Sequence, residues 1–362
     1  MIFRRRRRRA LPPPPRAPIP APVPAIEVAE PWAVEWTTDP AADGPPAAGR
    51  AAGHREPIGS VATAVVDGRA LAVTAGGEGV ARVWEVDGGR VLGELPVGRF
   101  DRVALDTRNG APVVLAVGDH RPEFARDPAS GRCLRTLPAD DATAVTTTVL
   151  DGRPVAVTCH EDGTVRGWEL TDAGPSARPL GEPVGGREYA LNAVAAAVVG
   201  GRLLAVSSSG MNVHQSWDGD VRLWDLTAGV PVAAFRAAAT SAVDAVALAD
   251  LGGRPVVVTG DWQGAVRLWD LAPGGRRPDG AELRGHTAGV WALAVTTIGG
   301  RAALASGSDD GTVRVWDLAT HEQVGPVLRF PHPVRGLAAA PGGRLVVCFG
   351  PQVAVLAHRG GS

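Results

Sequence analysis

One short segment recurs along this chain, and its spacing restricts the possible folds more than any other feature. Five apolar, Arg-containing copies end on a tryptophan followed by Glu or Asp, at Trp84, Trp168, Trp224, Trp269 and Trp316. The first two tryptophans are 84 residues apart, and residues 126–132 halfway between them form a degraded copy. A further degraded copy, Val353–Leu356, ends 40 residues after the last tryptophan. The segment therefore recurs about every 42 residues, half of the 84 that separate the first two tryptophans. A period of this length indicates a repeat architecture, here of seven units.

Each unit also contains a second element upstream of the recurring segment. Turns such as Asp67-Gly68-Arg69 and Asp151-Gly152-Arg153 open short runs that are rich in Val and Ala. Such runs, separated by Gly turns about ten residues apart, are typical of β-strands. Four strands in a unit of this length form one blade of a β-propeller, and neighbouring blades must cover each other's apolar faces. The sequence therefore predicts an all-β, seven-bladed β-propeller over residues 26–362.

The polar residues of two units follow one spacing. In each of these units a Gly-His pair is followed by three further residues, 20, 24 and 30 positions after the histidine. With the histidine, the four residues are His286, Ser306, Asp310 and Trp316 in unit six, and His54, Thr74, Glu78 and Trp84 in unit one. This pattern resembles the WD-repeat family. The resemblance implies that the four side chains form a hydrogen-bonded chain, a structural tetrad, which ties the outer strands of a blade to the inner ones. Unit three keeps Thr158, Asp162 and Trp168 but has Pro138 at the histidine position.

The resemblance also implies how the ring closes. The chain ends after the third strand of unit seven, and in the family a strand from the N-terminus supplies the fourth. Closure of this kind removes open sheet edges, which would invite aggregation. Ala33–Thr38 is the better candidate for the closing strand, and Gly49–Ala52 is the alternative.

Charge is unevenly distributed along the chain. Residues 1–25 are rich in Arg and Pro and include six consecutive arginines, Arg4–Arg9, whereas the net charge of the whole chain is −1. The tail is expected to be disordered, although a polyproline ligand or weak contact with nucleic acid or an anionic membrane surface is an alternative. The remaining body is mildly acidic, which argues against broad nucleic-acid binding. No stretch approaches the roughly 18 apolar residues needed to span a bilayer, so no membrane association is expected.

Cysteine usage and the missing lysines predict the setting of the protein. The three cysteines are far apart and form no C-x-x-C pair, which favours a reducing compartment without disulfides. We therefore expect a cytoplasmic protein. Every basic residue other than histidine is Arg, a bias that indicates a GC-rich and bacterial gene.

No catalytic motif, metal site or cofactor site is recognisable in the sequence. There is no lysine for a P-loop, and the patterns G-x-S-x-G and H-E-x-x-H are missing. The alternative to a non-enzymatic protein is a propeller-type hydrolase or lactonase with its site at the central channel. In such enzymes the metal ligands stand where the inner strands begin, which here corresponds to Gly59, Asp101, Thr143, Asn192, Asp244, Trp291 and Arg335. Of these, Asp101, Asn192 and Asp244 are possible ligands, but they are expected to be spread around the ring with no His among them, which makes the enzyme alternative weak.

Three tryptophans outside the repeated position point to a binding surface instead. Trp217 and Trp262 precede the position of the tetrad acid in units four and five, and Trp291 begins the inner strand of unit six. In the family these positions lie on the top rim, where the inner strands begin. Clustered aromatic residues dominate binding energy at protein interfaces. The insertion Ser209–Gln215 lies on the same rim and is typical of a binding face. We therefore predict that a monomeric scaffold binds a protein or peptide through Trp217, Trp262, Trp291, Asn192, Asp244 and Asp309.

Overall fold

The computed structural model describes most of the chain from residue 25 to residue 359. The described ranges are 25–38, 53–97, 102–108, 111–118, 123–126, 133–137, 141–170, 177–186, 190–209, 219–237, 241–271 and 280–359. Several predictions concern residues outside these ranges: the Arg/Pro-rich tail, the alternative closing segment 49–52, Asp101, Trp217 and nearly all of the insertion 209–215.

The described strands form seven sheets, numbered here as blades one to seven in chain order. Blade one contains β2 (Ile58–Val66), β3 (Arg69–Gly76), β4 (Val80–Glu85) and β5 (Val91–Pro96). Blade two contains β6 (Arg102–Arg108), β7 (Ala111–Val117), β8 (Glu123–Arg126) and β9 (Cys133–Leu137). Blade three contains β10 (Ala142–Leu150), β11 (Arg153–His160), β12 (Thr164–Glu169), β13 (Arg178–Pro179) and β14 (Val184–Gly185).

The second half of the chain continues the pattern. Blade four contains β15 (Leu191–Val199), β16 (Arg202–Ser209), β17 (Asp220–Asp225) and β18 (Val230–Arg236). Blade five contains β19 (Val243–Asp250), β20 (Pro255–Asp261), β21 (Val266–Asp270) and β22 (Ala281–Leu283). Blade six contains β23 (Val290–Ile298), β24 (Arg301–Ser308), β25 (Thr312–Asp317) and β26 (Leu328–Arg329). Blade seven contains β27 (Val334–Ala340), β28 (Arg344–Phe349), β29 (Gln352–His358) and β1 (Trp32–Thr37).

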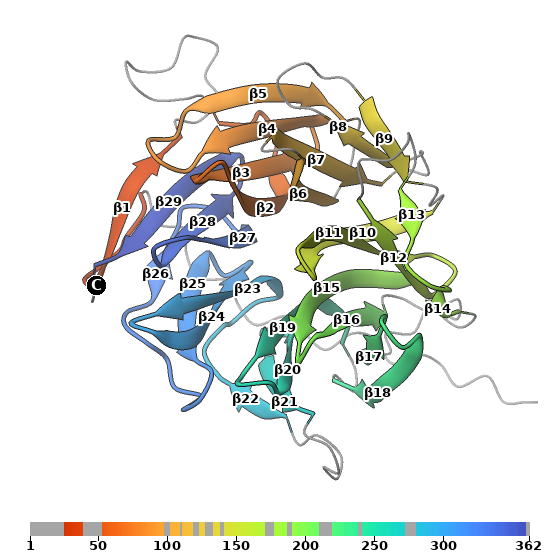
Figure 1. Cartoon of the computed structure of the whole chain (residues 1–362). Coiled ribbons are helices and arrows are strands. Elements are labelled where there is room, and N and C mark those ends of the chain that lie inside the picture. Colours follow the sequence, from red (N-terminus) through yellow and green to blue (C-terminus); the bar gives the residue numbers. More distant parts are fainter. Residues whose placement is uncertain are drawn as a thin grey trace, which may run out of the picture.

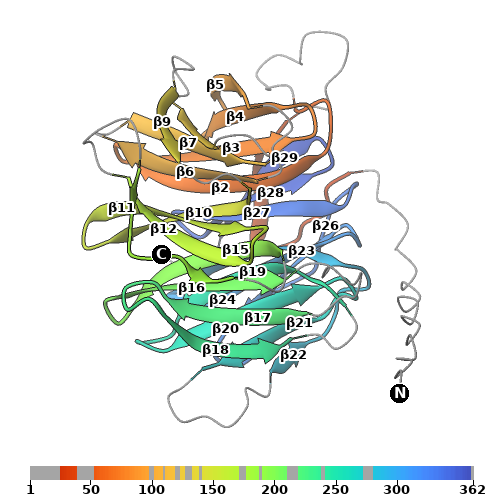
Figure 2. The same ribbon diagram turned by 90° about the vertical axis from the view of Figure 1, so that its right-hand side faces the viewer.

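The sheets are arranged as a ring around a common centre (Figure 1 and Figure 2). The first strand of each blade contacts the first strand of the next, in the order β2, β6, β10, β15, β19, β23 and β27, and β27 contacts β2. The described residues form strands and turns, and they include no helix long and apolar enough to cross a membrane. The prediction of an all-β propeller is confirmed.

The core lies between the blades rather than within any one of them. One cluster joins Val313 and Val315 of blade six to Leu345 and Val347 of blade seven, and another joins Ala72 of blade one to blade seven. Burial of apolar area contributes roughly 25 cal/mol per Å². Because both faces of each sheet are covered only by its neighbours, the blades stabilise one another around the ring.

β1 completes blade seven and connects the two ends of the described chain. It pairs antiparallel with β29, with Ala33 opposite Ala357 and Thr37 opposite Ala354. Trp32 at its start is 2% exposed and belongs to the core shared by blades six and seven. The backbone of Glu27 makes two further hydrogen bonds with Arg329. The closing strand predicted at 33–38 is therefore present, shifted by one residue.

Candidate functional site

The polar chain predicted for unit six is present in blade six. Trp316 Nε1 donates to Ser306 Oγ at 2.9 Å, Ser306 Oγ lies 2.8 Å from His286 Nε2, and His286 Nδ1 lies 3.1 Å from Asp310 Oδ2. All four side chains are buried. A buried polar group that lacks a partner is costly, so this chain satisfies its members mutually. His286 and Asp310 thereby fix the loops of the top rim to the body of the blade.

Blade one contains the conservatively altered version. His54 lies 2.7 Å from Thr74 Oγ1 and 2.5 Å from Glu78 Oε1, and Trp84 Nε1 donates to Thr74 at 2.7 Å. Glu78 also binds Arg82, which reaches Glu94 as well. Burial, followed by the nearby charge of Arg82, lowers the pKa of His54 to about 4.

The degraded blades keep only part of the chain. The bond from the tryptophan indole to a hydroxyl is retained in blades three, four and five: Trp168 to Thr158, Trp224 to Ser207 and Trp269 to Thr259. In blade three the fully buried His160 lies 2.8 Å from Thr158 Oγ1 and takes the place of the missing histidine. Asp162, read from the sequence as a tetrad member, instead binds Thr164 and Arg166.

The tetrad of blade six makes the stability of the protein depend on pH in the acidic range. Burial disfavours ionised Asp310, but its hydrogen bonds from His286, Thr312 and the Thr287 backbone outweigh burial and lower its pKa to about 2 from the ordinary 3.8. Because the folded-state pKa is depressed, this stabilisation is complete above about pH 4 and is lost as the pH falls toward 2.

Asp310→Asn should therefore lower the free energy of unfolding at neutral pH, and its ionisation linkage of about 2 kcal/mol should disappear in acid. Urea unfolding of both proteins between pH 5 and pH 2.5 measures this. The gap between wild type and variant should narrow as the pH falls. A difference in the free energy of unfolding that stays constant over that pH range would contradict the lowered pKa of Asp310.

A β-bulge occurs near the start of six inner strands, at the top rim. The register shifts between Ile58 and Ser60 in blade one, and equivalent shifts occur in blades three to seven. The skipped residues are Gly59, Thr143, Asn192, Asp244, Trp291 and Arg335. A bulge leaves its extra residue out of the ladder and re-aims the side chain. The fold thus presents equivalent positions around the mouth of the channel, and each holds a different residue type.

Arg335 and Trp291, from blades seven and six, interact directly. The Arg335 guanidinium carbon lies 5.1 Å from the centre of the Trp291 ring, a cation–π geometry. Arg335 also donates to both carboxylate oxygens of Asp309, at 2.9 and 3.3 Å. Asp309, one of the predicted contact residues, is 6% exposed and holds Arg335 in position through these two bonds.

Asn192 and Asp244, from blades four and five, form a second pair. The amide of Asn192 donates to Asp244 Oδ1 at 2.7 Å. Burial raises the pKa of Asp244, the carboxylates of Asp261 and Asp309 raise it further, and the Asn192 amide and Arg102 oppose this. The two pairs lie on four consecutive blades. We call Asn192, Asp244, Trp291 and Arg335 the polar arc.

A cavity of about 140 Å³ lies beside the polar arc. Its walls come from six inner strands, β2, β6, β15, β19, β23 and β27, which places it at the centre of the ring. Asp244, Trp291, Arg335 and Arg102 contribute the large or charged side chains of the wall. Among the described residues, no three His, Cys, Asp or Glu side chains gather in a way that could hold a metal ion.

Trp262 and Trp291 both approach Gly289 closely. Both tryptophans are half-buried. A methyl group added to Gly289 would lie 2.8 Å from Trp262 Cδ1 and 3.2 Å from Trp291 Nε1, so glycine permits this close approach. The structure thus brings together two of the three predicted aromatic residues, while Trp217 lies outside its described ranges. Sequence reasoning missed Asp261, whose carboxylate accepts the backbone N–H of Gln263 and binds Arg267 at 2.8 Å.

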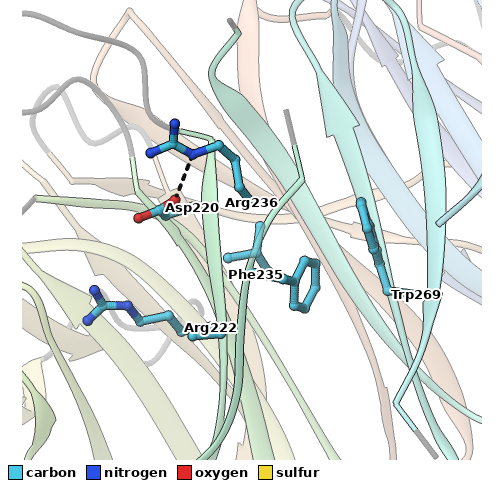
Figure 3. Close-up of a pocket in the computed structure, with 7 residues that line it drawn as sticks. Asp220, Arg222, Phe235, Arg236 and Trp269 are labelled. Atoms are coloured by element: carbon cyan, nitrogen blue, oxygen red, sulfur yellow. Dashed lines mark hydrogen bonds and ion pairs between the residues drawn. The ribbon is translucent and has the colours of Figure 1, made fainter. Parts of the chain in front are cut away.

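A second cavity, of about 580 Å³, lies between blades four and five (Figure 3). Phe235 points toward Trp269 with a ring separation of 4.6 Å, and Arg236 binds Asp220 at 3.3 Å. Residues 210–218, 238–240 and 272–279, which adjoin its strands in sequence, lie outside the described ranges. The polar arc is therefore the better defined site.

Comparisons with known proteins agree with this architecture. A family model described as WD domain, G-beta repeat, matches residues 279–317, which span most of blade six. A search of curated proteins gives no match. Among solved structures, the crystal structure of the WD40 beta propeller domain of Doa1 is similar, with a TM-score of 0.66 and 16% sequence identity. The alignment covers 90% of this chain and 96% of that one. One repeat is recognised by its sequence and the whole ring by its fold: the chain contains a WD repeat at residues 279–317 and has the fold of a WD40 β-propeller.

Proposed function

We propose that this protein is a non-enzymatic scaffold that binds a protein or peptide partner on the top rim of the propeller. The observation that carries the proposal is the set of bulged positions. Residues that only build a repeat recur from blade to blade, as the tryptophan of the recurring segment does. The bulged positions instead hold Gly, Thr, Asn, Asp, Trp and Arg. Diversity at equivalent positions favours recognition of a specific partner over a structural role.

The composition and size of the site favour a macromolecular partner. Aromatic residues and Arg are the side chains most enriched at interface hot spots, and Trp262, Trp291 and Arg335 lie together on this rim. The central cavity, of about 140 Å³, is well below the roughly 300–1,000 Å³ of small-molecule pockets. It therefore suits one side chain of a larger partner that covers the rim.

A hydrolase at the central channel is less well supported. Trp291 and Arg335 occupy two of the positions where such an enzyme would carry ligands, and they stack on each other. Asn192 and Asp244 are bound to each other rather than directed at a common point. The polar arc is thus a prearranged contact surface.

Affinity capture with mass spectrometry tests the proposal. The double variant Trp262→Ala/Trp291→Ala should stay folded, and the amount of partner that it captures should fall by about tenfold or more, as expected for hot-spot residues. The control is Val65→Ala/Val149→Ala, which removes exposed apolar side chains near the turns at the opposite ends of β2 and β10. A partner that is retained equally by both double variants would contradict binding at the top rim.

We further propose a monomeric, cytoplasmic and bacterial protein. Cys159 and Cys348 are buried free thiols, and burial raises the pKa of Cys159 to about 11. Unpaired thiols of this kind suit a reducing compartment. Among the residues whose burial the structure describes, the exposed large apolar side chains lie on three blades: Val65 on one, Val149 on three, and Val230 and Val232 on four. Their dispersion favours a monomer, and any nucleic-acid contact is assigned to Arg4–Arg9.

A further inference from the structure

Asp244 differs from two other acidic residues beside the polar arc, Asp261 and Asp309. Asp309 is paired with Arg335, and Asp261 is paired with Arg267. The carboxylate of Asp244 accepts one hydrogen bond, from the neutral amide of Asn192. Within the described part of the chain, no basic side chain forms an ion pair with it. A desolvated carboxylate without a cation is costly, and a stable fold does not need one here.

The surroundings of Asp244 show which kind of group would compensate it. Arg102 lines the same cavity from blade two and favours the ionised carboxylate. Burial and the carboxylates of Asp261 and Asp309 disfavour the ionised form. A positive group that enters the cavity would restore the balance. The apolar stem that carries such a group would also meet the indole of Trp291, which lines the cavity.

The shape of the cavity limits the size of that group. Its volume of about 140 Å³ admits a single long side chain but no folded element. A flexible side chain with an apolar stem and a charged end fits this combination of a carboxylate, an indole and a narrow space.

We propose that the cavity receives one basic side chain of the partner, whose guanidinium or ammonium group forms an ion pair with Asp244 while its stem packs on Trp291. The proposal rests on the proposed function, because it assumes that a protein or peptide covers the top rim. It assigns Asp244 as the residue that selects for positive charge, and Asn192 as the residue that positions the carboxylate.

Titration of the full-length protein with N-acetyl-arginine methylamide tests this, with the indole N–H resonances followed by NMR. Trp291→Phe identifies the Trp291 resonance. The arginine probe should shift this resonance saturably. Asp244→Asn should weaken the apparent affinity for the probe by about tenfold or more, because a desolvated charge partner is removed. N-acetyl-citrulline methylamide has the same shape without the charge and should have little effect. Asp250→Asn, at the far end of the same strand, is the matched control and should behave as wild type.

Two results would overturn the inference: equal shifts with the arginine and citrulline probes, or a wild-type response of Asp244→Asn. If Asp244→Asn fails to fold, the comparison of the two probes on the wild-type protein still decides. If partner capture depends on Trp291 but arginine is not preferred, the charge assignment fails and the scaffold stands. If capture does not depend on Trp291, the proposed function itself fails.

Discussion

A chain that begins at residue 39 should be much less stable than a chain that begins at residue 25, because only the second contains β1. Removing β1 takes away the buried Trp32 and leaves β29 as an open edge. Loss of one buried tryptophan side chain costs about 3–5 kcal/mol, before the lost strand pairing is counted. Since about 1 kcal/mol corresponds to roughly 2–4 °C in domains of 150–250 residues, a fall of about 10 °C or more is expected.

Differential scanning calorimetry of the two truncations and the full chain measures this effect. The chain that begins at residue 25 should have the same melting temperature as the full-length protein. Trp32→Ala in the full chain is an intermediate case, since it keeps the β1 backbone and removes only the indole. Its melting temperature should lie between those of the two truncations. Equal melting temperatures of the two truncations would refute closure of the ring by β1.

His286→Ala should destabilise the protein by about 1–3 kcal/mol more than His332→Ala, as expected when buried polar groups lose a partner. The His286 side chain is buried between Ser306 and Asp310, whereas His332 is an exposed residue before β27. Asp310 keeps its bonds from the backbone of Thr287 and Thr312. The loss therefore comes from the imidazole bonds and from the space that the ring vacates.

Guanidinium unfolding followed by tryptophan fluorescence compares the two variants. The expected order of midpoints is wild type, then His332→Ala close to it, then His286→Ala clearly lower. Indistinguishable midpoints of the two variants would show that the hydrogen-bonded chain of blade six does not contribute to stability.

The repeat was readable from sequence because its signals are local. A strand of four to nine residues needs only its own alternation and a turn at each end, so the spacing of tryptophans and Gly-Arg turns predicted the blades. The tetrads of blades one and six were predictable for a related reason, since fixed offsets of 20, 24 and 30 residues place the four side chains on neighbouring strands of one sheet. Blade three shows the limit of this logic, because His160 replaces the missing histidine from a position two residues after Thr158.

The arrangement of the proposed binding face could be predicted only in part. The positions that begin the inner strands were identified from the repeat, but Asn192 and Asp244 were expected to be spread around the ring, and the contact between Asp309 and Arg335 was not predicted. Asn192 and Asp244 are 52 residues apart in sequence and yet hydrogen-bonded, because adjacent blades bring their bulged positions together.

The amino-acid sequence by itself determined the all-β repeat, the strands of each blade and the residues of the two complete tetrads, since these depend on spacing within one unit. Only the tertiary structure decided which side chains of different blades meet: Arg335 with Trp291 and Asp309, Trp262 and Trp291 at Gly289, and Asn192 with Asp244. The physical reason is that a β-bulge turns one residue out of the ladder in six of the inner strands, and the closed ring decides which side chain of the next blade that residue meets.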